Sequence, residues 1–178
     1  MRIVVINGMP RAGKDEFVKM CQKHCYWCFN FSTVDFVKEV ATKCGWDGTK
    51  TPKNRKFLSD LKDLLTYWDD VPYKKIEREI LSANARMERH DFNPEKDGIV
   101  FIHCREPKEI HRFVTEMGAT ALLIRRPEIE NNEQSNHADA EVFDYPYHCV
   151  IRNDGTLEEL EGKAYLFLTK MGINNLQK

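Results

Sequence analysis

The sequence predicts an α/β fold in which helices cover both faces of a parallel sheet. Short runs of β-branched and aromatic residues alternate with longer segments of helical periodicity. The chain has 178 residues, enough for about one domain with a substantial core. Its 31% charged and 11% aromatic residues are typical of a packed globule. Strands separated by helices pair in parallel and bind ligands at their carboxyl ends.

The N-terminal half contains two predicted strands and four predicted helices. The β-branched run 2–7 is the first strand, and 28–32 is the second. The segment between them, 13–27, is a predicted helix whose apolar stripe is Phe17, Cys21, Cys25 and Cys28. Three further helices follow over 34–43, from Pro52 with Thr51 as its cap, and from Pro72 to about residue 90. The apolar stripe of the helix that begins at Pro52 ends at Trp68, which favours packing of Trp68 in a core over stacking on a base.

The C-terminal half continues the alternation. The predicted strands are 98–103, 119–124 and 147–151. One helix begins at Pro107 and ends at Gly118, and another begins at the capping box of Thr156 and Glu159 and ends before Gly172. Segment 93–98 is a predicted loop, and the polar segment 125–139 is a longer one.

Composition excludes several functional classes. The 27 Lys and Arg and 28 Asp and Glu residues leave a net charge of −1, which argues against a nucleic-acid or membrane coat. No apolar run approaches the length of a membrane span, and the N-terminus lacks a signal peptide. We therefore expect a cytoplasmic protein whose six cysteines are free thiols. Cys21, Cys25 and Cys28 share one predicted helix face, which favours core packing over zinc binding.

One motif carries specific chemistry. Gly8-Met9-Pro10-Arg11-Ala12-Gly13-Lys14-Asp15 fits G-x-x-x-x-G-K between a strand and a helix, which predicts a phosphate-binding loop. The glycines let backbone N–H groups face phosphate oxygens, and the helix N-terminus adds positive potential. Lys14 would reach the β- and γ-phosphates. Asp15 replaces the usual hydroxyl and is a hard oxygen ligand for Mg²⁺, directly or through water; a helix-capping role is the alternative.

These residues resemble the G-x-x-R-x-G-K-D loop of phage-type deoxynucleoside monophosphate kinases and of animal phosphomevalonate kinases. Other segments are similar to the first group in the same order, along nearly the whole chain. They are 31–39, 54–58, 102–109, 124–127, His137 and 151–155.

The resemblance implies a P-loop kinase fold with five parallel strands in the order 2-3-1-4-5. It implies a single domain over 1–178, with a helical acceptor-binding insertion over about 47–91 and a lid over about 125–140. The implied reaction transfers the γ-phosphate of ATP, with Mg²⁺, to a (deoxy)nucleoside monophosphate. No nucleic-acid or membrane partner is expected, and a homodimer is common in this group.

The resemblance also implies roles for individual residues. Lys14, Arg105 and Arg125 would be catalytic, since arginine forks bind phosphate oxygens in pairs. The acceptor would bind to Asp35, Lys38, Arg55 and Arg105. ATP would bind to Gly8, Met9, Pro10, Arg11, Ala12, Gly13, Lys14, Asp15, Glu16, Asn153, Asp154 and Gly155.

Two positions depart from the family pattern. His103 stands where the family has an aspartate at the end of the third strand, so a usual carboxylate is missing. In the lid, His137, Asp139 and Glu141 leave the alignment of the family's acidic residue open. Two alternatives therefore remain: a small-metabolite kinase of the phosphomevalonate type, and a catalytically silent ATP-binding module.

Overall fold

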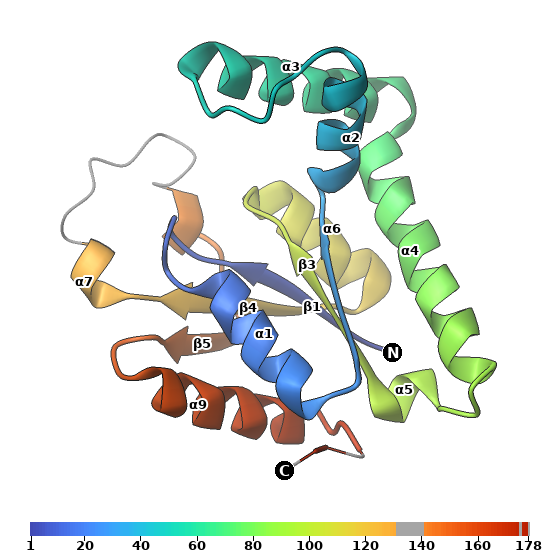
Figure 1. Cartoon of the computed structure of the whole chain (residues 1–178), viewed down its shortest axis with the longest axis vertical. Helices are drawn as coiled ribbons and strands as arrows, with labels where there is room; N and C mark the ends of the chain where they lie inside the picture. Colours follow the sequence, from blue (N-terminus) through green and yellow to red (C-terminus); the bar gives the residue numbers. More distant parts are fainter. Residues whose placement is uncertain (131–140, 175, 178) are drawn as a thin grey trace. The chain divides into compact units, whose positions relative to one another are not determined.

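The computed structural model describes residues 1–130, 141–174 and 176–177 (Figure 1). These residues form two compact units. The first unit comprises Met1–Asn30 and Asn84–Lys178, and the second comprises Phe31–Ala83. One strand and one helix each contain residues of both units.

A five-stranded sheet forms the centre of the first unit, with the strand order β2-β3-β1-β4-β5. This is the predicted order. Pairing is parallel, with Val4 opposite Phe101 of β3 and Thr120 of β4. The strands are β1 (Arg2–Asn7), β2 (Trp27–Ser32), β3 (Gly98–His103), β4 (Thr120–Arg125) and β5 (Cys149–Arg152).

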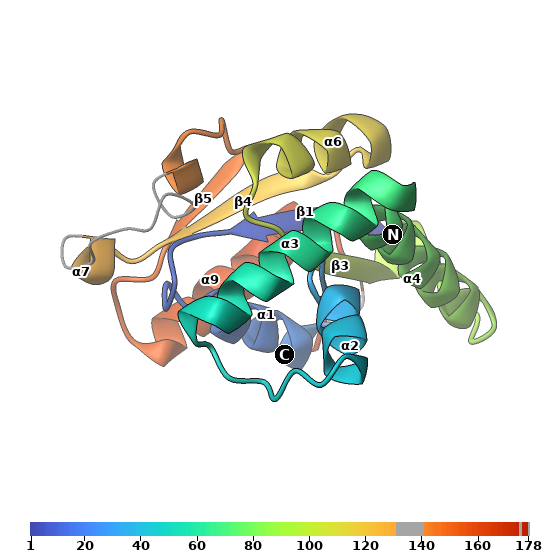
Figure 2. The ribbon, with the colours of Figure 1, turned by 90° about the horizontal axis from the view of Figure 1, so that it is seen from above.

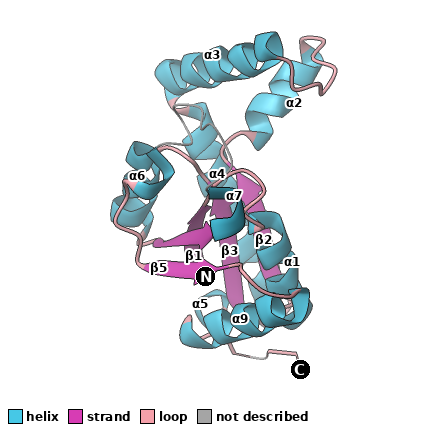
Figure 3. Ribbon diagram, turned by 90° about the vertical axis from the view of Figure 1, so that its left-hand side faces the viewer, coloured by secondary structure: helices cyan, strands magenta, loops and turns pink. Residues whose placement is uncertain are grey.

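Helices cover both faces of this sheet, as predicted for parallel strands. In Figures 2 and 3, α1 and α9 lie together on one face and α6 lies on the other. Phe17 of α1 makes edge contacts with Phe101 and Phe167, at ring-centroid distances of 6.2 and 5.7 Å. The first unit's helices are α1 (Lys14–His24), α5 (Pro94–Asp97), α6 (Pro107–Met117), α7 (Pro127–Glu130), the 3₁₀ helix η1 (Glu141–Phe143) and α9 (Leu157–Lys170).

The second unit is helical. It contains α2 (Asp35–Lys43), α3 (Pro52–Asp69) and most of α4 (Val71–Glu88). As predicted, the Thr51 side chain caps α3 by accepting a hydrogen bond from the N–H of Asn54, and Pro52 opens the helix. Asp70, with φ of 52°, makes the turn between α3 and α4.

Most other boundaries agree with the sequence patterns. β3 spans the predicted residues, and the last helix begins with both hydrogen bonds of the predicted capping box. Gly118 ends α6 with φ of 65°. Segment 93–98 is not a plain loop, because Asn93 caps the one-turn helix α5.

The prediction for the first helix was wrong at its C-terminal end. α1 ends at His24, Cys25 follows it with extended backbone, and Cys28 lies in β2. Only Cys21 of the three cysteines is therefore helical. All three are buried, and burial raises the pKa of each thiol, to about 11 for Cys25. Among the described residues, no three His, Cys, Asp or Glu side chains are grouped to hold a metal ion.

A second prediction was wrong in the helical unit. The apolar periodicity of α3 predicts that Trp68 packs in a core, but its side chain is 79% exposed and no residue of α3 is fully buried. Tyr73, at the start of α4, is the buried aromatic residue instead. Across the described residues, no helix has the length and apolarity needed to cross a membrane.

Candidate functional site

The loop between β1 and α1, which is predicted to bind phosphate, contains three residues with positive φ. Gly8, Arg11 and Gly13 have φ of 152°, 62° and 93°. A Cβ on Gly8 would lie 2.3 Å from the carbonyl oxygen of Ile124, and one on Gly13 would lie 2.2 Å from the side-chain nitrogen of Asn153. Only glycine fits these two positions without movement of the neighbours.

The loop leads directly into the N-terminus of α1, where Gly13 is the capping residue. The first turn of a helix directs N–H groups and positive potential toward its N-terminus, which favours phosphate. Lys14 is the first residue of α1, and its ammonium donates hydrogen bonds to the carbonyls of Gly8 and Met9, at 2.7 and 2.9 Å. The lysine charge therefore lies on the loop itself.

Asn7, the last residue of β1, holds the start of the loop through a hydrogen bond. Its side chain is fully buried, and its carbonyl accepts a 2.8 Å hydrogen bond from the N–H of Gly8. Its amide group donates to the Tyr147 hydroxyl at 2.8 Å and to the Arg105 carbonyl at 3.2 Å. The ends of β1 and β3 and the segment before β5 are thereby tied to one side chain.

Asn153, which follows β5, forms a hydrogen bond to the loop. Its backbone N–H donates to the Arg125 carbonyl at 2.7 Å, and its side-chain amide donates to the Ala12 carbonyl at 2.9 Å. The structure thus places Asn153 against the phosphate loop. The contact of Asn153 with adenine stays a prediction.

The other two residues of that predicted segment have local roles. The Asp154 carboxylate accepts hydrogen bonds from Lys163 at 3.2 Å and from Arg152 at 3.1 Å. The Lys163 hydrogen bond and charge lower the pKa of Asp154. Gly155 packs against the capping residue Glu159, where a Cβ would collide with the carboxylate.

Two predicted arginines follow strands of the sheet. Arg105 is exposed after β3, and Arg125 is the last residue of β4. The Arg125 guanidinium binds the Glu130 carboxylate, with Nη2 2.5 Å from Oε2, and lies 5.0 Å above the Phe143 ring. The hydrogen bonds to Glu130 raise the pKa of Arg125. In this structure Glu130 therefore neutralises the charge predicted to reach the transferring phosphate.

His103 and Asp15 face one another at the same edge of the sheet. His103 Nε2 lies 3.7 Å from Asp15 Oδ1, and the two side chains are 16% and 85% exposed. Asp15 and Glu16 form the acidic first turn of α1, and Glu16 pairs with Lys19 at 3.4 Å. The carboxylate predicted to bind Mg²⁺ is thus accessible, which fits a cation ligand.

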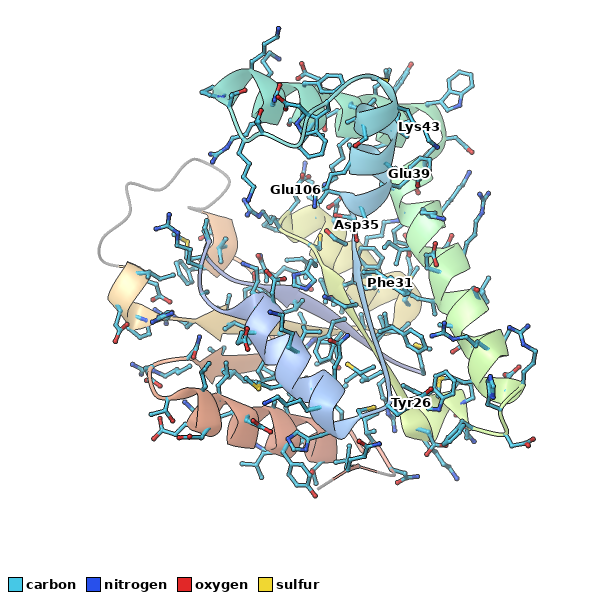
Figure 4. All side chains as sticks on the ribbon, viewed as in Figure 1. Tyr26, Phe31, Asp35, Glu39, Lys43 and Glu106 are labelled. Carbon is cyan, nitrogen blue, oxygen red and sulfur yellow. The ribbon has the colours of Figure 1, made fainter. Side chains whose placement is uncertain are left out.

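The predicted acceptor residues other than Arg105 belong to the second unit. Asp35 accepts a hydrogen bond from the Ser32 N–H at 2.9 Å, and its carboxylate lies 3.7 Å from the Lys38 ammonium. In Figure 4, Asp35, Glu39 and Lys43 follow one another along α2. Within this unit the Arg55 side chain is exposed and makes no hydrogen bond or ion pair with the residues that the structure describes.

The structure therefore divides the predicted site residues into two sets. The phosphate loop, Arg105, Arg125 and 153–155 belong to the first unit, whereas Asp35, Lys38 and Arg55 belong to the second. Of the lid predicted over 125–140, the helix α7 is seen. His137 and Asp139 lie outside the described residues, as does the side chain of Glu141.

No protein-family model matches the sequence, and no curated protein matches it. Among solved structures, the tunicamycin resistance protein of Deinococcus radiodurans is similar over 99% of this chain and 98% of that chain, with 12% identity and a TM-score of 0.55. The chain thus has the P-loop nucleotide-kinase fold. A dephospho-CoA kinase from Campylobacter jejuni matches at 11% identity, 96% and 97% coverage and a TM-score of 0.46. A shikimate kinase from Aquifex aeolicus matches at 16% identity, 96% and 97% coverage and a TM-score of 0.44.

Sequence patterns missed three residues around the P-loop. Asn7 ends an apolar strand, and a polar residue there was a usable signal for an anchor. Glu130 lies five residues after Arg125 in a polar segment, where nothing marks it as a partner. Tyr147 is 140 residues from Asn7, and no local pattern indicates their contact.

Proposed function

We propose that this chain is an ATP-dependent kinase that transfers the γ-phosphate to a (deoxy)nucleoside monophosphate. The observation that carries the proposal is the P-loop, in which Lys14 rests on the carbonyls of Gly8 and Met9 at the N-terminus of α1. A site of this kind binds a nucleoside triphosphate through backbone N–H groups and one lysine. Arg105 and Arg125 add cationic side chains at the carboxyl ends of β3 and β4, the two strands that flank β1.

The reaction needs positioning more than acid–base chemistry. An oxygen of the acceptor phosphate forms a bond to the γ-phosphorus, and the bond to the β-phosphate oxygen of ATP breaks to release ADP. The attacking oxygen is already largely ionised near neutral pH, because the second pKa of a phosphate ester is about 6. Lys14 stabilises the charge that develops between the β- and γ-phosphates.

The arginines act on the same charge. Arg125 must exchange its Glu130 partner for phosphate oxygens in order to contact the transferring group. Arg105 would bind the acceptor phosphate through its planar fork, together with Lys38 and Arg55. Asp35 would accept hydrogen bonds from the acceptor, and Asn153 would lie beside the adenine.

The exposed carboxylate of Asp15 fits a divalent cation. Such an ion, Mg²⁺ in most kinases, neutralises charge on the β- and γ-phosphate oxygens when it is bound. The contribution of this chain is to hold Asp15 in the first turn of α1, immediately after the lysine.

Two observations favour a second candidate, a nucleotide-binding module without turnover. The β3 strand ends in His103 instead of a carboxylate, and the Arg125 guanidinium forms an ion pair with Glu130. A kinase acting on a small phosphorylated metabolite uses the same loop chemistry and is distinguished by its acceptor.

A coupled ADP-release assay separates these functions. The purified chain is mixed with ATP and Mg²⁺, and each ribo- and deoxynucleoside monophosphate and phosphomevalonate is added in turn. We expect ADP release that depends on one nucleotide acceptor. Release only with phosphomevalonate would support the metabolite kinase, and ATP binding without release under any condition would support the silent module.

A further inference from the structure

The contact between His103 and Asp15 is not explained by phosphate binding alone. His103 ends β3 and its side chain is 16% exposed, so the strand holds the ring in place. Its Nε2 atom lies 3.7 Å from Oδ1 of Asp15. The strand thus brings an imidazole nitrogen to the carboxylate that we assign to the cation.

The separation of these two atoms is suitable for one shared metal ion. Ligand atoms each about 2.1 Å from an ion lie roughly 3.0 Å apart at a right angle and at most about 4.2 Å apart when opposite. The observed 3.7 Å lies within this interval and is too long for a direct hydrogen bond.

The chemistry of the pair selects the kind of ion. Mg²⁺ prefers oxygen ligands, whereas imidazole suits first-row transition metals. Mn²⁺ accepts carboxylate and phosphate oxygens as well, so it fits a site with one nitrogen ligand next to bound nucleotide. We infer that Asp15 and His103 jointly bind one divalent transition-metal ion, with Mn²⁺ favoured over Mg²⁺. The inference rests on the proposed function, because nucleotide phosphates would supply the remaining oxygens.

The alternative is a simple ion pair between the two side chains. Asp15 is 85% exposed, and exposed ion pairs contribute little to stability. Two protein ligands also hold a metal weakly, and the Lys14 ammonium lies on the same loop. We therefore expect tight binding of Mn²⁺ only when ADP is present.

Pulsed electron paramagnetic resonance tests the inference without an activity measurement. Mn²⁺ is added to the chain with ADP, and the spin-echo modulation is searched for coupling to an imidazole nitrogen. We expect this coupling in the wild-type chain and its loss in His103→Asp. In competition with Mg²⁺, the preference for Mn²⁺ should fall by at least about tenfold in His103→Asp, the loss typical of a removed metal-site partner.

Controls separate the metal from the fold and from nucleotide binding. His111→Asp is the matched control, because His111 is exposed on α6, and it should keep the nitrogen coupling. Asp15→Asn changes an exposed side chain and should lower Mn²⁺ affinity even if His103→Asp proves unstable. Mn²⁺ that binds to the wild-type chain without nitrogen coupling would overturn the metal inference but not the proposed function. Absence of ADP binding, measured by calorimetry, would overturn the proposed function as well.

Discussion

The Asn7 side chain donates a 2.8 Å hydrogen bond to the hydroxyl of Tyr147, 140 residues further along the chain. Tyr147 in turn donates to the Val142 carbonyl at 2.8 Å. Because Asn7 also accepts from the N–H of Gly8, this chain of bonds connects the start of the P-loop to the segment before β5.

Removing the Tyr147 hydroxyl should loosen this connection. In Tyr147→Phe, the buried Asn7 amide and the Val142 carbonyl each lose a partner, which should lower the free energy of unfolding by about 1–3 kcal/mol. ATP affinity should also fall, because Asn7 holds Gly8. Chemical denaturation and calorimetry measure the two effects. Tyr145→Phe is the control, since within the described residues the Tyr145 hydroxyl makes no hydrogen bond; an equal loss in both variants would contradict the role of Tyr147.

The same residue predicts a pH dependence. Burial raises the pKa of Tyr147 from its ordinary 10.0 to about 12. The unfolded chain therefore ionises this tyrosine first, and the stability that Tyr147 contributes is lost as the pH rises from about 10 to about 12. The stability difference between the wild type and Tyr147→Phe should narrow by about 1–2 kcal/mol over this range. Denaturation series at several pH values measure it, and a constant difference would refute the assignment.

The addition of one methyl group at position 13 tests whether the loop requires glycine there. Gly13→Ala places a Cβ 2.2 Å from the Asn153 amide at φ of 93°, so we expect a loss of about 1–3 kcal/mol and weaker ATP binding. Gly162→Ala is the control, because nothing lies within 4 Å of its Cβ position in α9. That change should stabilise the chain by about 0.5–1 kcal/mol. If thermal unfolding ranks the two variants in the opposite order, the described loop geometry is incorrect.

Sequence patterns predicted the elements whose signals are local. β3 and α6 were predicted because an apolar run, a proline at the first helical position and a terminal glycine all lie within the segment. The end of α1 was missed because cysteines at helical spacing continue past His24 into β2, where the fold and not the periodicity decides. The exposure of Trp68 was missed because a stripe on a helix does not say what covers it.

The residues of the candidate site also divide into those that a local sequence pattern predicts and those that it does not. The loop between β1 and α1 was predicted because its residues are consecutive and include two glycines, and its binding of phosphate stays a prediction. The roles of Arg105, Asp35, Lys38 and Arg55 stay predictions. The ion pair of Arg125 with Glu130 could not be predicted, because many charges in that polar segment lie within reach of the arginine.

Releasing Arg125 from Glu130 should strengthen ATP binding. Glu130→Gln removes the negative charge that pairs with the Arg125 guanidinium. We therefore expect the ATP Kd to fall about two- to tenfold at low salt, with a smaller effect at high salt. Titration calorimetry at two ionic strengths measures this. Glu128→Gln removes the same charge from a side chain that is 69% exposed and pairs with Arg126 instead. An equal change in the ATP Kd of both variants would show that the effect comes from the net charge of the chain and not from the release of Arg125.

Transfer of labelled phosphate tests the central claim most directly. The wild-type chain is incubated with ATP labelled at the γ-phosphate and each nucleoside monophosphate, and the products are separated. We predict that label appears in one nucleoside diphosphate, is absent with Lys14→Ala, and persists with Lys19→Ala, whose lysine is 67% exposed on the same helix. Label transfer by Lys14→Ala at the wild-type rate, or no labelled diphosphate from any acceptor, would contradict a P-loop nucleotide kinase.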